Sequence, residues 1–233
     1  ISKHILFLLE DSSFPPLVML DGDWGEGKTY YTKNTLIPEL ECHGEKCVFF
    51  SLTGLSSISD FKDRLLSASL LKNEINSEQG SAMSNIVNSL ITNFGGSSGG
   101  TVASLLSGAT GLIKESMLSR ISNMIIIIDD LDRVQESDLC DLIVGECLQL
   151  SDTGRLKFIF IVNDEKSLTN KALKEKVFSG TVKLNRSISE SVHIAFSGYE
   201  WFSEHKDDVI KAVEAKRLKN LRILKRAANK LTY

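Results

Sequence analysis

A glycine-rich segment near the start of the chain has the residue types and spacing that bind polyphosphate. The segment Gly22-Asp23-Trp24-Gly25-Glu26-Gly27-Lys28-Thr29 fits G-x-x-x-x-G-K-[ST] at every fixed position. Its glycines let the backbone turn and approach phosphate oxygens, whose charge is neutralised by N–H groups at a helix N-terminus. Lys28 adds a mobile positive charge, and the Thr29 hydroxyl is suited to Mg²⁺. We predict that residues 22–29 and the following Tyr30 bind a nucleoside triphosphate.

A second group of candidate residues follows four consecutive isoleucines. The run Met124–Ile128 shows no alternation of apolar and polar residues, which is typical of a strand buried on both faces of a parallel sheet. Carboxylates at the C-terminal end of such a strand face the ligand crevice. We therefore expect Asp129 to hold Mg²⁺ through its water shell and Asp130 to polarise the attacking water as a general base.

A third candidate position follows the apolar run 156–162. Asn163 or Asp164 could hydrogen-bond the γ-phosphate or the attacking water. Either residue could equally cap the helix that comes next. Both interpretations stay open at the level of the sequence.

The elements expected around these residues alternate between strands and helices. Strands are predicted at 17–21, 47–52, 124–128, 156–162 and 181–184. Helices are predicted at 1–10, from Lys28 to a bend at Pro38, at 60–71, at 137–150 and after the capping box Ser187–Glu190, and the chain is helical and increasingly basic from Tyr199 onward. This pattern predicts one α/β domain.

The segment 77–119 interrupts that alternation with the cluster Gly95–Gly100. Its two flanks form either a membrane hairpin or two short helices in an insertion. Residues 101–113 are too few, and too rich in Ser and Gly, to cross a hydrocarbon core of ~30 Å. We expect an insertion and no transmembrane segment.

Composition limits the partners and the setting. Lysine and arginine number 27 against 30 aspartates and glutamates, and this net charge of −3 argues against whole-surface attraction to nucleic acid. The basic stretch 206–230 suits either nucleic-acid binding or a solvated helix face, and its few aromatic residues favour the second. The four cysteines lack C-x-x-C spacing, which indicates a reduced cytoplasmic setting. Because the chain begins at Ile1 rather than Met, we expect a fragment of a longer protein.

The two motifs together resemble the KAP family of P-loop NTPases, relatives of the AAA+ and STAND classes. The specific parts are the tryptophan before the middle glycine of the loop and the string Asp129-Asp130-Leu131-Asp132-Arg133. Weaker similarity lies in Ser51-Leu52-Thr53-Gly54, Glu175-Lys176-Val177 and Asn220-x-Arg222-x-x-Lys225-Arg226. Many members carry transmembrane helices between the two motifs, where this chain has its Gly/Ser-rich segment.

The resemblance implies a five-stranded parallel sheet of order 5-1-4-3-2, with an NTPase core at 1–185 and a C-terminal helical lid at 186–233. It implies that Arg222 reaches the γ-phosphate from the lid and that Asn163 or Asp164 acts as a first sensor. Arg133 would either stabilise charge across a subunit boundary or pair with Asp132, and we favour the pairing.

These features predict a Mg²⁺-dependent ATPase that acts as a nucleotide-driven switch or an oligomeric motor. Because the family includes bacterial phage-exclusion proteins, a role in prokaryotic defence or signalling is expected. The alternative is a non-hydrolysing, ATP-gated binding module whose protein or nucleic-acid partners lie outside this sequence. A small-molecule kinase fits less well, because the paired aspartates end a strand that is not next to the loop.

Overall fold

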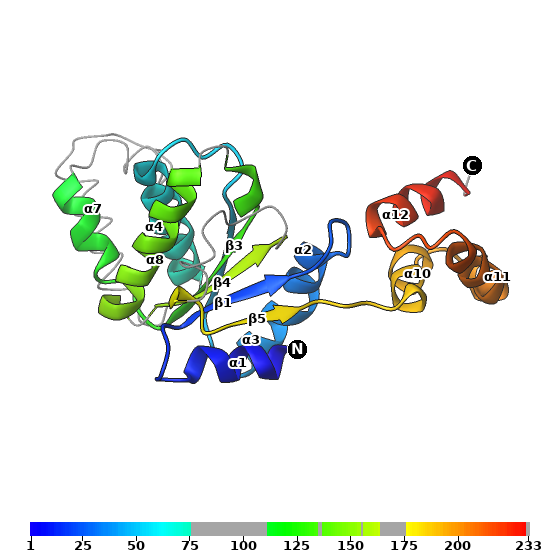
Figure 1. Cartoon of the computed structure of the whole chain (residues 1–233), viewed down its shortest axis with the longest axis horizontal. Coiled ribbons are helices and arrows are strands. Elements are labelled where there is room, and N and C mark those ends of the chain that lie inside the picture. The colour runs from blue at the N-terminus through cyan, green and yellow to red at the C-terminus, as the bar shows by residue number, and fades with distance from the viewer. Residues whose placement is uncertain (76–110, 135–136, 155, 164–175, 232–233) are drawn as a thin grey trace.

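The computed structural model describes residues 1–75, 111–134, 137–154, 156–163 and 176–231. Five parallel strands form a single sheet in it (Figure 1). The strands are β1 (Leu17–Asp21), β2 (Cys47–Ser51), β3 (Met124–Asp129), β4 (Leu156–Val162) and β5 (Gly180–Lys183). Their order is β2-β3-β4-β1-β5, and every pair is parallel. The predicted order 5-1-4-3-2 is the same arrangement counted from the other edge, so the predicted fold is confirmed.

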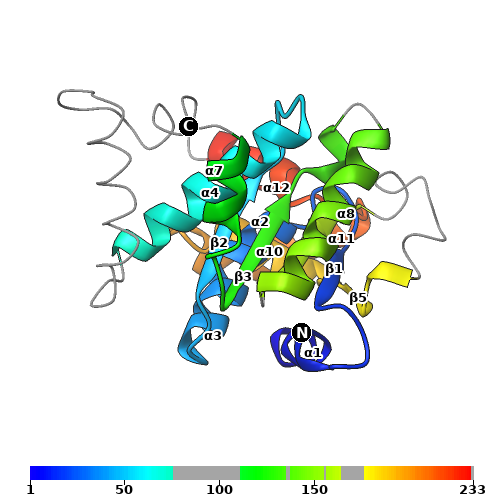
Figure 2. The same cartoon turned by 90° about the vertical axis from the view of Figure 1, so that its left-hand side faces the viewer.

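Helices cover both faces of the sheet, as the unbroken apolar runs require. Ile126 and Ile128 of β3 pack toward α4 (Ile58–Ile75), α7 (Gly111–Leu118) and α8 (Ser137–Gly154). Figure 2 shows these three helices in front of the sheet. Ile125 and Ile127 face the opposite layer, which contains α1 (Ser2–Glu10), α2 (Lys28–Tyr31) and α3 (Ile37–Cys42). All four isoleucines are fully buried, so β3 is a central strand.

The helix after the phosphate loop (residues 22–29) differs from the predicted form. It does not simply bend at Pro38, because a π-helical segment, Thr32–Leu36, joins α2 to α3. Pro38 has no N–H to donate to the preceding turn, so the regular hydrogen-bond pattern cannot continue through it.

The last three helices pack on one another beyond the β5 edge of the sheet (Figure 1). They are α10 (Ile188–Phe196), α11 (Phe202–Ala215) and α12 (Leu221–Lys230). Their apolar side chains form a separate cluster that includes Phe196, Phe202 and Leu224. The capping box that opens α10 is confirmed, since the Ser187 side chain accepts from the Glu190 N–H and the Glu190 carboxylate accepts from the Ser187 N–H. We call α10–α12 the helical unit.

Part of the predicted insertion falls outside the described residues. Of segment 77–119, the structure describes only 111–119, which contain α7, so the cluster Gly95–Gly100 is not among them. Asp164, one of the two candidate sensors, also lies outside. Within the described ranges, no helix has the length and apolar character needed to cross a membrane.

Candidate nucleotide-binding site

The phosphate loop is closed by its own side chains between β1 and α2. Gly25 and Gly27 have φ angles of 91° and 84°, the left-handed region that favours glycine. Glu26 is buried, and its carboxylate accepts a hydrogen bond from the Asp23 N–H at 2.9 Å. A Cβ on Gly22 would lie 2.6 Å from that carboxylate. Gly22, Asp23 and Glu26 therefore shape the loop and do not line the cavity described below.

Lys28 folds back over the loop. Its ammonium group donates to the carbonyl oxygens of Gly22 and, at 3.2 Å, of Asp23. Burial lowers the pKa of Lys28 from its ordinary value, against the opposing effects of nearby carboxylates such as Asp21 and Glu26. An ammonium group binds a negatively charged oxygen more strongly than a neutral carbonyl oxygen. A phosphate oxygen is therefore a better partner for Lys28 than either carbonyl.

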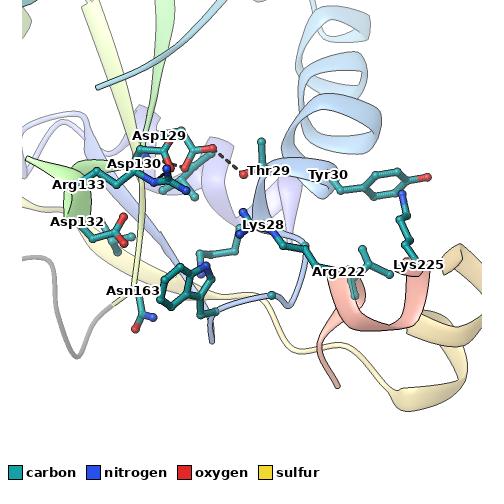
Figure 3. Close-up of a pocket in the computed structure, with 16 residues that line it drawn as sticks. Lys28, Thr29, Tyr30, Asp129, Asp130, Asp132, Arg133, Asn163, Arg222 and Lys225 are labelled. Atoms are coloured by element: carbon teal, nitrogen blue, oxygen red, sulfur yellow. Dashed lines mark hydrogen bonds and ion pairs between the residues drawn. The ribbon is translucent and has the colours of Figure 1, made fainter. Parts of the chain in front are cut away.

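Thr29 and Asp129 meet although they are 100 positions apart in the sequence. The Thr29 hydroxyl donates to Asp129 Oδ2 at 2.6 Å, and the Asp130 N–H donates to Oδ1 at 2.8 Å. Burial raises the pKa of Asp129, with the hydrogen bond from Thr29 acting in the opposite direction. Figure 3 shows the two side chains turned toward each other beside Lys28.

The Asp130 carboxylate is held by two partners that the sequence did not identify. The Ser51 hydroxyl donates to Oδ2 at 2.6 Å, and Arg133 Nε lies 2.9 Å from Oδ1. Arg133 therefore pairs with Asp130, and the favoured pairing with Asp132 was wrong. The reason is the short 3₁₀ turn Leu131–Arg133, together with the left-handed conformation of Asp130. Ser51 is available because β2 pairs with β3, which places Ser51 opposite Asp129.

These groups line one cavity of about 230 Å³ between the carboxyl ends of the strands and the helical unit (Figure 3). Asn163, which follows β4, and Arg222 and Lys225 of α12 lie on its wall, so the structure brings together the predicted catalytic residues. The full lining is Trp24, Gly25, Gly27, Lys28, Thr29, Tyr30, Asp129, Asp130, Asp132, Arg133, Ile161, Val162, Asn163, Leu221, Arg222 and Lys225.

The first turn of α12 is hydrogen-bonded to the phosphate loop. The Leu221 N–H donates to the Gly25 carbonyl at 2.7 Å, and Asn220 Nδ2 donates to the Trp24 carbonyl at 3.3 Å. Asn220 also caps α12, since its Oδ1 accepts from the Arg222 N–H at 3.0 Å. In the sequence Asn220 stood out only as part of a family-like string, and nothing in its spacing indicated contact with the loop.

A second, wider cavity of about 500 Å³ lies where the chain passes from β5 to α10. We call it the hinge cavity. It is lined by Ile1, Tyr31, Leu184, Asn185, Arg186, Ser189, Glu190, His193, Ile194 and Lys206. The Tyr31 hydroxyl is hydrogen-bonded to Ser2 Oγ at 2.8 Å, which fixes this ring at the cavity wall. The sequence did not indicate this cavity, because its lining comes from four separate parts of the chain: Ile1, Tyr31, residues 184–194 and Lys206.

The arrangement suits a magnesium-bound polyphosphate. The described residues contain no cluster of three or more His, Cys, Asp or Glu side chains that could hold a metal by themselves. Mg²⁺ is commonly held by one or two carboxylates together with substrate phosphates and water, and Asp129 with the Thr29 hydroxyl supplies that protein share. The residues therefore fit the ion, provided that a phosphate completes the set.

Comparison with known proteins agrees with the geometry. The whole chain, residues 1–233, matches the model of the KAP family P-loop domain. Similar solved structures are the Drosophila ORC bound to DNA (16% identity, TM-score 0.53, covering 98% of this chain) and a DNA replication initiation factor (12%, 0.51, 99%). At these identities the likeness shows the fold alone, and this chain spans 58% and 59% of the lengths of the two chains. Among curated protein sequences none matches significantly. The chain belongs to the KAP family of P-loop NTPases.

Proposed function

We propose that this chain binds ATP with Mg²⁺ and hydrolyses it, acting as a nucleotide-driven switch or as a subunit of an oligomeric motor. The observation that carries the proposal is the 2.6 Å contact between Thr29 and Asp129 beside Lys28. It joins the phosphate loop to the acidic end of β3, so that both groups face one cavity.

The phosphate loop and Asp129 would bind the triphosphate. Lys28 exchanges its loop carbonyls for the β and γ oxygens, to which its charge is better matched. Thr29 and Asp129 hold Mg²⁺, which when bound neutralises the charge that develops on the phosphoryl oxygens.

Asp130 and Asn163 would act on the attacking water. Asp130 is the general base, and Ser51 and Arg133 fix the direction of its carboxylate. Asn163, on the wall of the same cavity, orients the water or the γ-phosphate through its amide. Each carboxylate oxygen can accept more than one hydrogen bond, so a water can reach Asp130 while its contacts with Arg133 and Ser51 persist.

The helical unit would report which nucleotide is bound. Arg222 lies on the cavity wall, where it can reach the γ-phosphate, and Asn220 and Leu221 of the same helix end contact the loop. Loss of the γ-phosphate removes the partner of Arg222, so α12 can shift relative to the sheet. The nucleoside would occupy the hinge cavity, because that cavity borders α2, the helix that begins at the phosphate loop, at Tyr31.

One observation favours the second candidate, an ATP-gated binding module that does not hydrolyse. Both carboxylate oxygens of Asp130 are engaged, one by Arg133 and one by Ser51. If these contacts turn the carboxylate away from the attacking water when ATP is bound, the water is not activated and the triphosphate remains intact. A binding titration beside a turnover assay separates the two candidates.

The test is ATP turnover measured against protein concentration, with and without Mg²⁺ and with and without DNA. We expect Mg²⁺-dependent turnover whose specific rate rises with concentration, because an oligomer can supply an arginine in trans. Binding without turnover at any concentration would establish the second candidate. Failure to bind ATP in a calorimetric titration would overturn both. A change on adding DNA would identify a partner that the net charge of −3 does not favour.

We also propose a cytoplasmic setting and a role in prokaryotic anti-phage defence or signalling. All four cysteines are free thiols, as is usual in a reducing compartment. The defence role rests on the family resemblance. Phage plating on cells that carry the natural protein or its Lys28→Ala variant tests it, with protection expected only from the natural protein.

A further inference from the structure

Arg186 occupies a position between the two cavities. It follows β5 at the start of the link to the helical unit, and its guanidinium lies over the rings of Tyr30 and Tyr31, with Cζ 5.8 and 5.9 Å from their centroids. Its Nη1 atom is 2.8 Å from where a Cβ on Gly27 would lie. Arg186 lines the hinge cavity, while Gly27 and Tyr30 line the phosphate cavity.

The Nη1 atom of Arg186 is buried and has no hydrogen-bond partner in the part of the chain that the structure describes. Glu190 is a nearby acid, but its carboxylate accepts hydrogen bonds from the Ser187 N–H and hydroxyl in the cap of α10. A buried guanidinium N–H without a partner destabilises the chain, and an anion would remove that penalty. Arginine stays protonated, so its charge is available at any working pH.

The location identifies the anion. A triphosphate whose β and γ groups contact Lys28 has its α-phosphate as the next group toward the nucleoside. A nucleoside in the hinge cavity lies across Arg186 from the phosphate loop, because Arg186 lines that cavity while its guanidinium lies beside Gly27 and Tyr30 of the phosphate cavity. The phosphate chain must therefore pass the Arg186 guanidinium on its way from one cavity to the other.

We propose that Arg186 binds the α-phosphate of the nucleotide and connects the phosphate cavity with the hinge cavity. This inference rests on the proposed ATP binding and adds a residue to it. It makes the link after β5 sensitive to whether any nucleotide is present, whereas Arg222 senses the γ-phosphate alone. Arg186 carries no reacting atom, so its role is in binding.

The test compares Arg186→Gln with Lys183→Gln, a matched loss of one positive charge on the same segment. Lys183 is exposed on β5 and lines neither cavity. Affinities for ATP, ADP, AMP and adenosine are measured by competition against radiolabelled ATP. Because a hydrogen bond to a charged group is lost, Arg186→Gln should weaken ATP, ADP and AMP alike by about tenfold to a hundredfold and leave adenosine unchanged. Lys183→Gln should leave all four unchanged.

The outcomes distinguish this inference from the proposed function. If the natural chain binds no ATP, the proposed function fails. If it binds ATP and Arg186→Gln binds equally well, only the role of Arg186 is overturned. Equal loss of adenosine would also overturn it, as would a loss confined to ATP, since these place Arg186 at the nucleoside or the γ-phosphate. Should Arg186→Gln not fold, Arg186→Lys keeps the charge on a shorter group and should show a smaller, equally uniform loss for the three nucleotides.

Discussion

The two sides of the phosphate cavity are positioned in different ways. On the sheet side, Asp129 and Asp130 follow a strand with four fully buried isoleucines, and strand pairing sets Ser51 opposite Asp129. On the helical side, α12 contacts the loop through the Asn220 side chain and the Leu221 N–H. Moving the sheet side would break the core, whereas moving α12 breaks a few hydrogen bonds. The rigid side suits chemistry, and the loosely attached side suits a response to the nucleotide.

Replacing Lys28 by alanine should have the largest effect, because it removes the positive charge of the phosphate loop that binds the triphosphate. We expect Lys28→Ala to weaken ATP binding by at least about a hundredfold, since contacts with two phosphates are lost together. Isothermal titration calorimetry measures this. Lys33→Ala is the control, because Lys33 stacks over Phe49 (Nζ 4.4 Å from the ring centroid) and does not line the cavity. Unchanged ATP affinity in Lys28→Ala would show that the phosphate loop does not bind the triphosphate.

Asp130→Asn tests the rigid side without removing its binding groups. The amide keeps the size of the carboxylate but cannot accept the proton of water, so turnover should fall by about a hundredfold or more while ATP affinity stays near the parental value. Steady-state phosphate release gives the rate. Asp132→Asn, two residues later, should retain most of the turnover. Parental turnover in Asp130→Asn would show that the base has been assigned to the wrong residue.

Asp129→Asn separates metal binding from stability. Burial raises the pKa of Asp129 above its ordinary value of 3.8, so the folded chain favours the protonated form. The stability that this preference contributes is present at low pH and is lost as the pH rises through the folded value. At about pH 7 we therefore expect Asp129→Asn to raise the melting temperature of the nucleotide-free chain. At a pH below the ordinary pKa of 3.8, the variant should give no increase in melting temperature.

The same variant should lose most of the added stability that Mg²⁺-ATP gives the natural chain, because a neutral amide is a poorer ligand for Mg²⁺. Melting curves across this pH range, with and without Mg²⁺-ATP, measure both effects. A lower melting temperature without nucleotide at about pH 7 would mean that the Thr29 contact outweighs the burial of charge. Undiminished stabilisation by Mg²⁺-ATP would exclude Asp129 from the metal site.

Most of the sheet was predictable because β1, β2 and β3 contain uninterrupted apolar runs and β4 is interrupted only by Lys157, and the family resemblance supplied the strand order. The acids at the end of β3 were predictable because their position depends only on that strand. The partners of Asp130 were not, since Ser51 reaches it through the pairing of β2 with β3, and Arg133 reaches it through a left-handed turn. Asn220 and Arg186 depend on how the helical unit meets the loop, which is a tertiary arrangement without local periodicity.

Asn220→Ala should give the smallest effect. It tests most directly how α12 is attached to the phosphate loop. Loss of the α12 cap should lower the free energy of unfolding by about 1 kcal/mol. For a chain of this size the melting temperature should then fall by about 2–4 °C. The matched control is Ser187→Ala, which removes the cap of α10 and has no contact with the phosphate loop.

If the contact with Trp24 attaches α12 to the loop, the two cap variants should melt alike without nucleotide and differ once ATP is added. Asn220→Ala would then lose part of the stabilisation by ATP, and tryptic cleavage in the basic segment 216–226 would no longer depend on the nucleotide. Ser187→Ala would keep both responses. Identical responses of the two variants to ATP would mean that Asn220 acts only as a helix cap, and that its contact with Trp24 does not couple α12 to the nucleotide.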